Sequence, residues 1–251
     1  MKSLCIIQAR TSSTRLPNKI MLKVNNKPLL QHQIERLKKV KKIDKIVVAT
    51  TTNKKDGAII NLCKKIKIDF FRGSEEDVLS RYYKCSLVYP EYKTIIRSTS
   101  DCPLIDPEVV ENVISFFKKN DLDYASSAAL NKFTFPDGID IEIFKLKLLK
   151  EAYENAKSKH EREHVTIYIQ NKKGIKKECF TSKIDFSHFR FTVDELKDFE
   201  VIRFIIENTP PNASYLEHIA FITKYPHIMV KNMNIKRNEG MLKSKNAKKQ
   251  S

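Results

Sequence analysis

The sequence predicts an α/β fold, and three observations support that prediction. Short apolar segments alternate with longer amphipathic segments over about the first 120 residues, which is the rhythm of βαβ units. The chain of 251 residues is long enough for one sizeable core and short for two. Charged and hydroxyl residues follow several of the apolar segments, and the carboxyl ends of parallel strands are where such folds bind ligands.

The elements follow one another in a regular order up to residue 120. Strands are expected at 4–9, 45–51, 69–72 and 93–97, and helices at 29–40, 56–65, 75–88 and 107–119. Beyond residue 121 the pattern changes to short strands and hairpin-like segments, followed by helices near 146–156, 162–171 and 196–207. The last segment, 231–251, is polar and rich in lysine, which predicts a loosely ordered basic tail.

The loop after the first expected strand carries three cations, with short hydroxyl residues between them. They are Arg10, Arg15 and Lys19, and Ser12, Ser13 and Thr14. An arginine presents a planar fork to two phosphate oxygens, and a lysine supplies a compact charge. The loop matches neither glycine-rich phosphate motif, G-x-x-x-x-G-K-[ST] or G-x-G-x-x-G. It therefore predicts a polyphosphate site, and a solvated basic loop is the alternative.

Two aspartates follow apolar segments that are far apart in the chain. Asp101 comes after the run 94–96. Asp194 directly follows the segment 189–193, which is expected to be a strand. Magnesium bound together with phosphates takes one or two protein carboxylates, so this pair predicts a magnesium site. The alternative for each aspartate is a turn or a helix cap. Asp106 precedes a proline and a glutamate, and it is expected to cap the helix at 107–119.

Six segments of the chain, taken in order, resemble the spore coat polysaccharide biosynthesis protein F family of cytidylyltransferase-like proteins. The resemblance covers about residues 3–207. The first segment also resembles the nucleotide loop of CMP-KDO synthetase, a more distant relative. The six segments are 6–19, 71–82, 101–106, 136–142, 161–166 and 192–194.

The resemblance implies a three-layer αβα domain of glycosyltransferase-A type, built on a mostly parallel mixed sheet. The domain would span 1–230, with a nucleotide-binding half at 1–120 and an acceptor-binding half at 121–230. The implied reaction is attack by an oxygen of a sugar acid or sugar phosphate on the α-phosphorus of a nucleoside triphosphate, with pyrophosphate leaving. CTP is the favoured nucleotide, although GTP and UTP stay open. Such enzymes serve polysaccharide biosynthesis, and related ones are often homodimers.

The resemblance also assigns roles, which we carry over only to matching positions. Arg10, Lys19 and Asp101 would be catalytic, and Asp101 and Asp194 would hold Mg²⁺. The nucleotide would contact Ala9, Arg10, Ser13, Arg15, Lys19, Arg72 and Ser100. The resemblance places the whole segment 72–81 near the nucleotide, although Ser74 and the three acids after it are equally a plain helix start.

The middle of the chain is expected to bind the acceptor. Asp140 and Glu142 alternate with isoleucines, so they would share one face of a strand and bind hydroxyls or amines. The alternatives for this pair are an approach to the metal or the wet side of an edge strand. Arg162 is the candidate for an acidic group of the acceptor, and His164 is expected to orient substrate or to serve the structure rather than to act as a base.

Net charge and cysteine content limit which other functions the sequence could have. The net charge of +17 raises a nucleic-acid-binding protein as the main alternative. The lysines are dispersed, as at Lys38 and Lys39, and no RNP-type or helix-turn-helix pattern is present, so solvated faces are preferred. A catalytically silent paralogue is the third hypothesis, which the retained site residues oppose. The five cysteines lack C-x-x-C spacing, which predicts neither disulfides nor a zinc site and leaves Cys102 as a filler.

The sequence also predicts where in the cell the protein is located and whether it binds a membrane. No apolar run approaches the ~20 residues that span a bilayer, and the first residues lack a signal-peptide pattern. A cytoplasmic enzyme without membrane or nucleic-acid partners is therefore expected.

Overall fold

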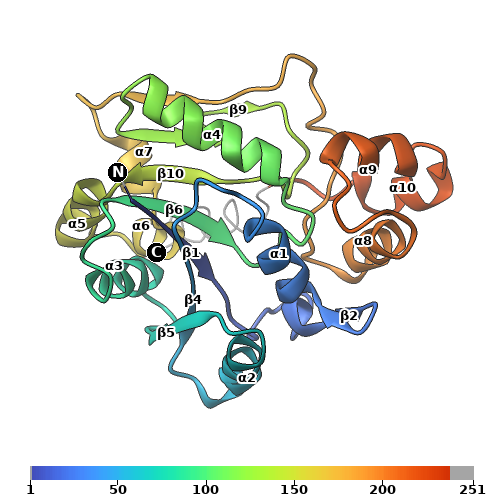
Figure 1. The fold of residues 1–251 in the computed structure, drawn as a ribbon, viewed down its shortest axis with the longest axis horizontal. Coiled ribbons are helices and arrows are strands. Elements are labelled where there is room, and N and C mark those ends of the chain that lie inside the picture. Colours follow the sequence, from blue (N-terminus) through green and yellow to red (C-terminus); the bar gives the residue numbers. More distant parts are fainter. Residues whose placement is uncertain (1, 238–251) are drawn as a thin grey trace, which may run out of the picture.

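A seven-stranded sheet forms the centre of the molecule, as Figure 1 shows for residues 2–237, the part of the chain that this computed structural model describes. The strand order is β11-β7-β10-β6-β1-β4-β5. β10 runs antiparallel to its neighbours β6 and β7, and the other pairs are parallel. The prediction of a mostly parallel mixed sheet is therefore confirmed. The strands are β1 (Ser3–Gln8), β4 (Lys45–Thr51), β5 (Asp69–Gly73), β6 (Thr94–Thr99), β7 (Tyr124–Ser126), β10 (Glu142–Lys145) and β11 (Lys177–Cys179).

Helices cover both faces of this sheet and complete the three predicted layers. Successive residues of a strand point to opposite faces, so Cys5 and Ile7 enter one core, and Leu4 and Ile6 enter the other. The first core includes residues of α1 (Leu29–Leu37), α2 (Gly57–Lys65), α4 (Pro107–Lys119), α8 (Leu196–Asn208) and α9 (Tyr215–Ile222). The second core includes residues of α3 (Val78–Leu87), α5 (Leu146–Asn155) and α7 (Ile167–Asn171). In Figure 1, α8, α9 and α10 (Pro226–Met233) lie together at one end of the molecule.

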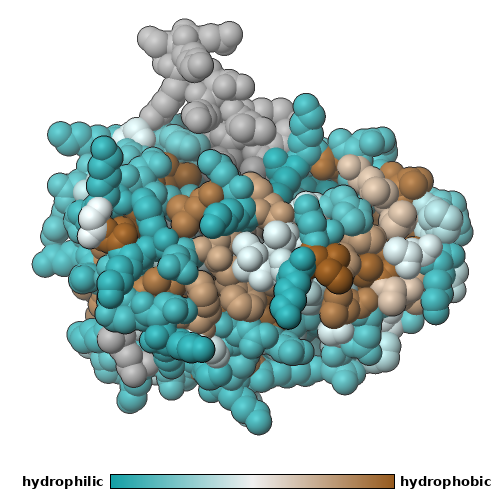
Figure 2. Space-filling model, turned by 90° about the horizontal axis from the view of Figure 1, so that it is seen from above, coloured by the Kyte–Doolittle hydropathy of each residue, from teal (hydrophilic) through white to brown (hydrophobic). Residues whose placement is uncertain are grey.

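Short elements lie in the connections between the main strands and helices. They are η1 (Lys19–Met21), the ribbon of β2 (Lys23–Val24) and β3 (Lys27–Pro28), η2 (Lys54–Asp56), the hairpin of β8 (Ala128–Ala129) and β9 (Lys132–Phe133), and α6 (Lys159–His164). Figure 2 shows one face of the molecule, which is mostly hydrophilic, as expected of a chain in which 31% of the residues are charged. The described residues include no helix with the length and apolar character that crossing a membrane requires.

Several boundaries differ from those predicted, each for a local reason. α3 begins at Val78 rather than at residue 75, because the Asp77 side chain accepts a hydrogen bond from the Ser80 amide and caps the helix. The helix predicted at 162–171 divides into α6 and α7 at Val165, whose φ of 57° interrupts the helix. The strand predicted around 136–142 begins only at Glu142. The segment 189–193 is not a strand, although it forms one isolated bridge to Asp137.

The end of the described chain packs on the core, in contrast to the predicted tail boundary at residue 231. α10 continues to Met233, and Asn232 is 2% exposed. Arg237 forms an ion pair with Asp140 and donates a hydrogen bond to the Phe135 carbonyl. The first seven residues of the predicted tail therefore belong to the folded body, and 238–251 lie outside the described residues.

Gly138 lets the segment that carries Asp137 and Asp140 approach the chain at Phe191. Its φ is +103°, and a Cβ would lie 2.5 Å from both the Phe191 carbonyl carbon and the Thr192 amide nitrogen. Because these obstructing atoms are backbone, they cannot rotate away. We expect Gly138→Ala to lower the free energy of unfolding by more than ~2 kcal/mol, combining strain with a clash. Denaturant unfolding monitored by circular dichroism measures this loss of stability.

Gly174→Ala is the matched control for this substitution. Gly174 also has a positive φ, +75°, but no atom lies within 4 Å of the point that a Cβ would occupy. Only backbone strain of ~1 kcal/mol is expected there. Equal losses in the two variants would contradict the close approach at Gly138.

Candidate active site

The cationic loop between β1 and η1 is held at its base by a buried carboxylate. The amide and hydroxyl of Thr11 both donate to Asp56 Oδ1, at 2.8 and 2.7 Å. Asp56 is 1% exposed, and the Thr51 hydroxyl also donates to it. Burial would raise the pKa of Asp56, but the hydrogen bonds from the two threonines outweigh it and lower the pKa. A buried anion thus anchors the start of the loop at Thr11.

Lys19 lies between the two aspartates that the sequence predicts as a pair. Its Nζ is 3.2 Å from Asp101 Oδ2 and 2.8 Å from Asp194 Oδ1. The aspartates converge because the Val193 amide donates to the Asp101 carbonyl at 2.9 Å, which joins two segments distant in sequence. The Thr192 hydroxyl donates to the same carbonyl. Burial would lower the pKa of Lys19, but the two carboxylates outweigh it and raise the pKa.

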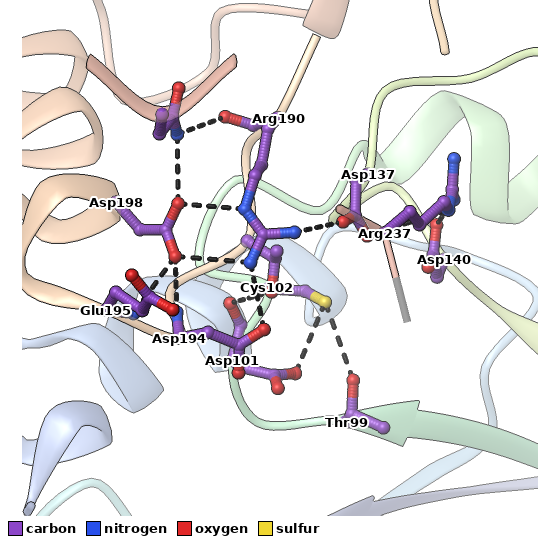
Figure 3. A network of polar contacts seen from close by, with 12 residues as sticks. Thr99, Asp101, Cys102, Asp137, Asp140, Arg190, Asp194, Glu195, Asp198 and Arg237 are labelled. Carbon is purple, nitrogen blue, oxygen red and sulfur yellow. Dashed lines mark hydrogen bonds and ion pairs between the residues drawn. The ribbon is translucent and has the colours of Figure 1, made fainter. Parts of the chain in front are cut away.

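Arg190 fixes the second aspartate from behind, as Figure 3 shows. Its side chain is 4% exposed, and its guanidinium contacts Asp137, Asp194 and Asp198. Asp198 is itself fully buried and accepts hydrogen bonds from the amides of Asp194 and Glu195. Asp194 therefore offers Oδ2 to Arg190 and Oδ1 to the cationic loop.

The surrounding cations set the charge of Asp194. Burial would raise its pKa, but Lys19, Arg15 and Arg190 outweigh burial and hold the pKa at about 2. Arg15 Nη2 lies 2.9 Å from Asp194 Oδ1. This carboxylate is therefore ionised at any pH at which the protein is expected to work.

The donor set fits a magnesium ion bound together with a nucleotide. Two carboxylate oxygens, from Asp101 and Asp194, already converge on one positive group, the Lys19 ammonium. The described residues form no cluster of three or more metal-ligating side chains. Two carboxylates are what Mg²⁺ uses when phosphates and water complete its coordination.

Two cavities meet at these aspartates. The larger one, of about 550 Å³, lies against the cationic loop, and the smaller one, of about 310 Å³, extends toward β7, β10 and α7. Residues common to both cavities are Gln8, Arg15, Thr99, Asp101, His164 and Asp194. The arrangement can hold two ligands side by side, one on each side of Asp101 and Asp194.

Most of the predicted nucleotide residues line the larger cavity. They are Ala9, Arg10, Ser13, Arg15, Lys19 and Ser100. Arg72 is placed elsewhere, because its guanidinium donates to the Thr51 and Thr52 carbonyls and does not line either cavity. Arg81, at the other end of the segment 72–81, lines the larger cavity and is 2% exposed. Its buried Nε has no hydrogen-bond partner among the described residues.

Three of the four predicted acceptor residues line the smaller cavity: Asp140, Glu142 and His164. Arg162 does not, because it forms an ion pair with Asp77 and donates to the Tyr153 and Ala156 carbonyls. α6, which carries Arg162, packs on α3, and this contact directs the guanidinium away from the cavity.

Ionisation differs among the groups of the smaller cavity. Burial raises the pKa of Asp140 to about 7, an effect that Arg237 opposes and that Asp137 and Asp101 increase. Burial, the neighbouring His160 and Arg97 lower the pKa of His164 to about 4, so this imidazole is neutral at pH 7. A neutral imidazole suits hydrogen bonding to substrate, as the sequence predicts.

Cys102 faces the smaller cavity without the features of a nucleophile. It is 2% exposed, and its Sγ contacts the Thr99 hydroxyl and the Asp101 carboxylate. Burial raises the pKa of its thiol well above the ordinary value. This agrees with the predicted role as a filler.

The fold and this arrangement agree with a family of known enzymes. The model of the cytidylyltransferase family matches residues 4–235. The chain belongs to the cytidylyltransferase family. The resemblance recognised in the sequence is thereby confirmed, and this cytidylyltransferase is a nucleotidyltransferase.

Relatives match this cytidylyltransferase over nearly its whole length. It is 38% identical over 240 residues to an uncharacterized protein of Methanocaldococcus jannaschii, with 94% of this chain and 96% of that protein covered. It is 31% identical over 237 residues to the spore coat polysaccharide biosynthesis protein SpsF of Bacillus subtilis, with 89% and 95% covered. The solved structure of a cytidylyltransferase from Leptospira borgpetersenii has a TM-score of 0.87 and 34% identity, and covers 94% of this chain and 100% of that one.

Sequence reasoning missed several polar residues of this cytidylyltransferase that line the cavities or support them. Gln8 and Arg97 line the smaller cavity from β1 and β6, and Arg190 supports Asp194. Each of these three residues lies among apolar residues. Gln8 and Arg97 lie on the strand face that enters the second core. A long polar side chain at a core position is the signal that could have identified them.

Proposed function

We propose that this protein transfers CMP from CTP to an oxygen of a sugar acid or sugar phosphate, with Mg²⁺ as cofactor and pyrophosphate as the second product. The observation that carries the proposal is the meeting of the two cavities at Asp101 and Asp194, with Lys19 between the carboxylates. The larger cavity would take CTP, and the smaller one the acceptor. The family and the charge of the cationic loop support this assignment.

The residues on the nucleotide side would bind and neutralise the triphosphate. Arg10, Arg15 and Lys19 lie along one wall of the larger cavity, where their charges would stabilise the departing pyrophosphate. Asp101 and Asp194 would hold Mg²⁺, which when bound supplies charge neutralisation at phosphate oxygens. No covalent bond to the protein is required, since positioning and electrostatics account for phosphoryl transfer of this kind.

The residues on the acceptor side would orient the attacking oxygen. Asp140 and His164 line the smaller cavity and can accept or donate hydrogen bonds to sugar hydroxyls. By analogy with the name of the relative from Bacillus subtilis, the activated sugar would enter polysaccharide biosynthesis. A homodimer located in the cytoplasm stays a prediction of the sequence.

Pyrophosphate release tests this function. Each of the four nucleoside triphosphates is incubated with the protein and a panel of sugar acids and sugar phosphates, with and without Mg²⁺. We expect release with CTP, an acceptor from the panel and Mg²⁺ together, and none when Mg²⁺ is removed by chelation. No release under any combination, together with no calorimetric binding of CTP, would contradict the proposal.

A further inference from the structure

The junction between α6 and α7 contains a strained turn centred on Val165. Its φ is 57° and its ψ is −58°, and the Thr166 amide donates to the His164 carbonyl at 2.5 Å. These values describe the γ-turn whose central residue has a positive φ, which is rare and strained. A β-branched residue is an outlier in this region, where a glycine would meet no strain. The surrounding structure must therefore hold the turn in place.

The apolar side chain of Val165 anchors the turn from below. It is 0% exposed and belongs to the second core, together with Leu149 of α5 and Ile169 of α7. Burial of an apolar side chain stabilises the conformation that achieves it, in proportion to the area removed from water. The same residue that strains the backbone thus supplies the burial that offsets the strain.

A second anchor holds the residue after the turn. The Thr166 hydroxyl donates to Glu142 Oε1 at 2.7 Å. The same oxygen accepts from the Tyr124 hydroxyl at 2.5 Å and the Gln170 amide at 3.1 Å. Arg97 is the register partner of Glu142 on β6 and donates to its Oε2. Glu142 is therefore fixed from both sides and ties Thr166 to the sheet.

The turn changes which side chains can face the site. In a continuous helix, which the sequence predicts over 162–171, residues two positions apart differ in direction by ~200°. His164 and Thr166 would then lie on opposite faces of that helix. With the turn between them, both line the smaller cavity, and His164 also lines the larger one. The break in the helix thus brings His164 to the wall that the two cavities share with Asp101 and Asp194.

We propose that Val165 is a positioning residue, whose strained turn carries the His164 imidazole to the place where the two cavities meet. The proposal rests on the proposed function, because CTP and the acceptor would come together at that place. Val165 lines neither cavity, so it acts through His164 and not by touching a ligand. Its buried side chain holds the turn against the continuous helix that the local sequence favours.

The first test removes the anchor and measures turnover. Val165→Ala deletes the isopropyl methyl groups, so the turn should relax and displace the imidazole. We expect kcat/KM for the acceptor to fall by ~10–100-fold, the scale of a small misplacement within a catalytic site. Val165→Ile keeps a branched apolar side chain and should recover most of the activity. The measurement is pyrophosphate release with CTP, Mg²⁺ and the acceptor that the panel identifies.

Val47→Ala is the matched control, because it deletes the same atoms from the same core. Val47 lies on β4, is fully buried, and lines neither cavity. Its replacement should lower the urea midpoint by at least as much as Val165→Ala does, since no relief of strain offsets the lost packing. Its kcat/KM should stay within a few fold of wild type. Equal losses of activity in Val47→Ala and Val165→Ala would overturn the inference.

A double-mutant cycle shows whether Val165 acts through His164. His164→Ala alone should slow turnover, and adding Val165→Ala to it should cause no further loss. Losses that multiply in the double variant would mean that Val165 supports only the fold, and would overturn the inference. A wild-type rate for His164→Ala would overturn it as well.

An NMR titration of His164 reports its position without any turnover. Burial, together with His160 and Arg97, lowers the pKa of this imidazole to about 4, and Glu142 opposes them. In Val165→Ala the pKa should rise toward the ordinary value of ~6.5, because the imidazole leaves its buried place. An unchanged pKa would overturn the inference and leave the proposed function standing. Failure of CTP to bind the wild type in calorimetry would overturn the proposed function and the substrate role of His164, while the titration still decides whether Val165 holds the imidazole.

Discussion

Lys19→Ala and Asp101→Asn are each expected to slow turnover by at least ~100-fold, the scale for removing one preorganised charge partner of a transition state. The Lys19 side chain is 12% exposed and contacts both Asp101 and Asp194, so its charge lies where the two cavities meet, within reach of a triphosphate in the larger one. The measurement is the steady-state rate of pyrophosphate release at saturating CTP and acceptor.

Arg72→Ala is the matched control for these variants. The sequence suggests Arg72 for the nucleotide site, but the structure bonds it to backbone carbonyls beside β4 and outside both cavities. Its loss should therefore leave turnover within a few fold of wild type. A rate near wild type for Lys19→Ala or Asp101→Asn would undo the role assigned to that residue, and a large loss for Arg72→Ala would contradict its placement.

Arg190→Met is expected to lower the free energy of unfolding by ~3–5 kcal/mol, because it takes the cation from the buried Asp198 and removes one of the cations that Asp137 and Asp194 contact. Asp198 is 0% exposed, and Asp137 and Asp194 also depend on this guanidinium. Desolvated acids would then repel one another across the network drawn in Figure 3. Urea unfolding at pH 7, with the wild type measured alongside, gives the difference.

Arg203→Met is the control, because it makes the same substitution at an arginine on the surface. Arg203 is exposed on α8, where it lies over the Phe199 ring at 5.9 Å, and its replacement should change stability by no more than ~0.5 kcal/mol. If Arg190→Met cost no more than Arg203→Met, the buried network would not hold Asp194 as described.

The first half of the fold was predictable because its elements repeat a simple pattern. Buried parallel strands read as apolar runs, and the amphipathic helices between them show a different period, so β4 and α4 were placed with the bounds observed. The second half was less predictable. The turn at Val165 and the bridge of Asp137 to Arg190 depend on tertiary contacts that no local pattern reports.

The site residues, like the fold, were predictable only in part. Lys19, Asp101 and Asp194 were predictable because they follow segments expected to end at the same edge of the sheet, and the structure brings them together. Arg162 was placed at the acceptor because its charge suits an acid, but the packing of α6 on α3 directs it to Asp77. Arg97 was overlooked, since a single charge within a buried strand shows its partner only when β10 is seen beside it.

The binding of CTP with a metal at the paired aspartates tests the central claim most directly. We would determine a crystal structure of the protein with CTP and Mn²⁺, and locate the metal by its anomalous scattering. The account predicts a manganese peak bonded to both Asp101 and Asp194, with the triphosphate along the cationic loop and the Lys19 ammonium moved onto it. A metal or triphosphate located elsewhere on the molecule would contradict the account.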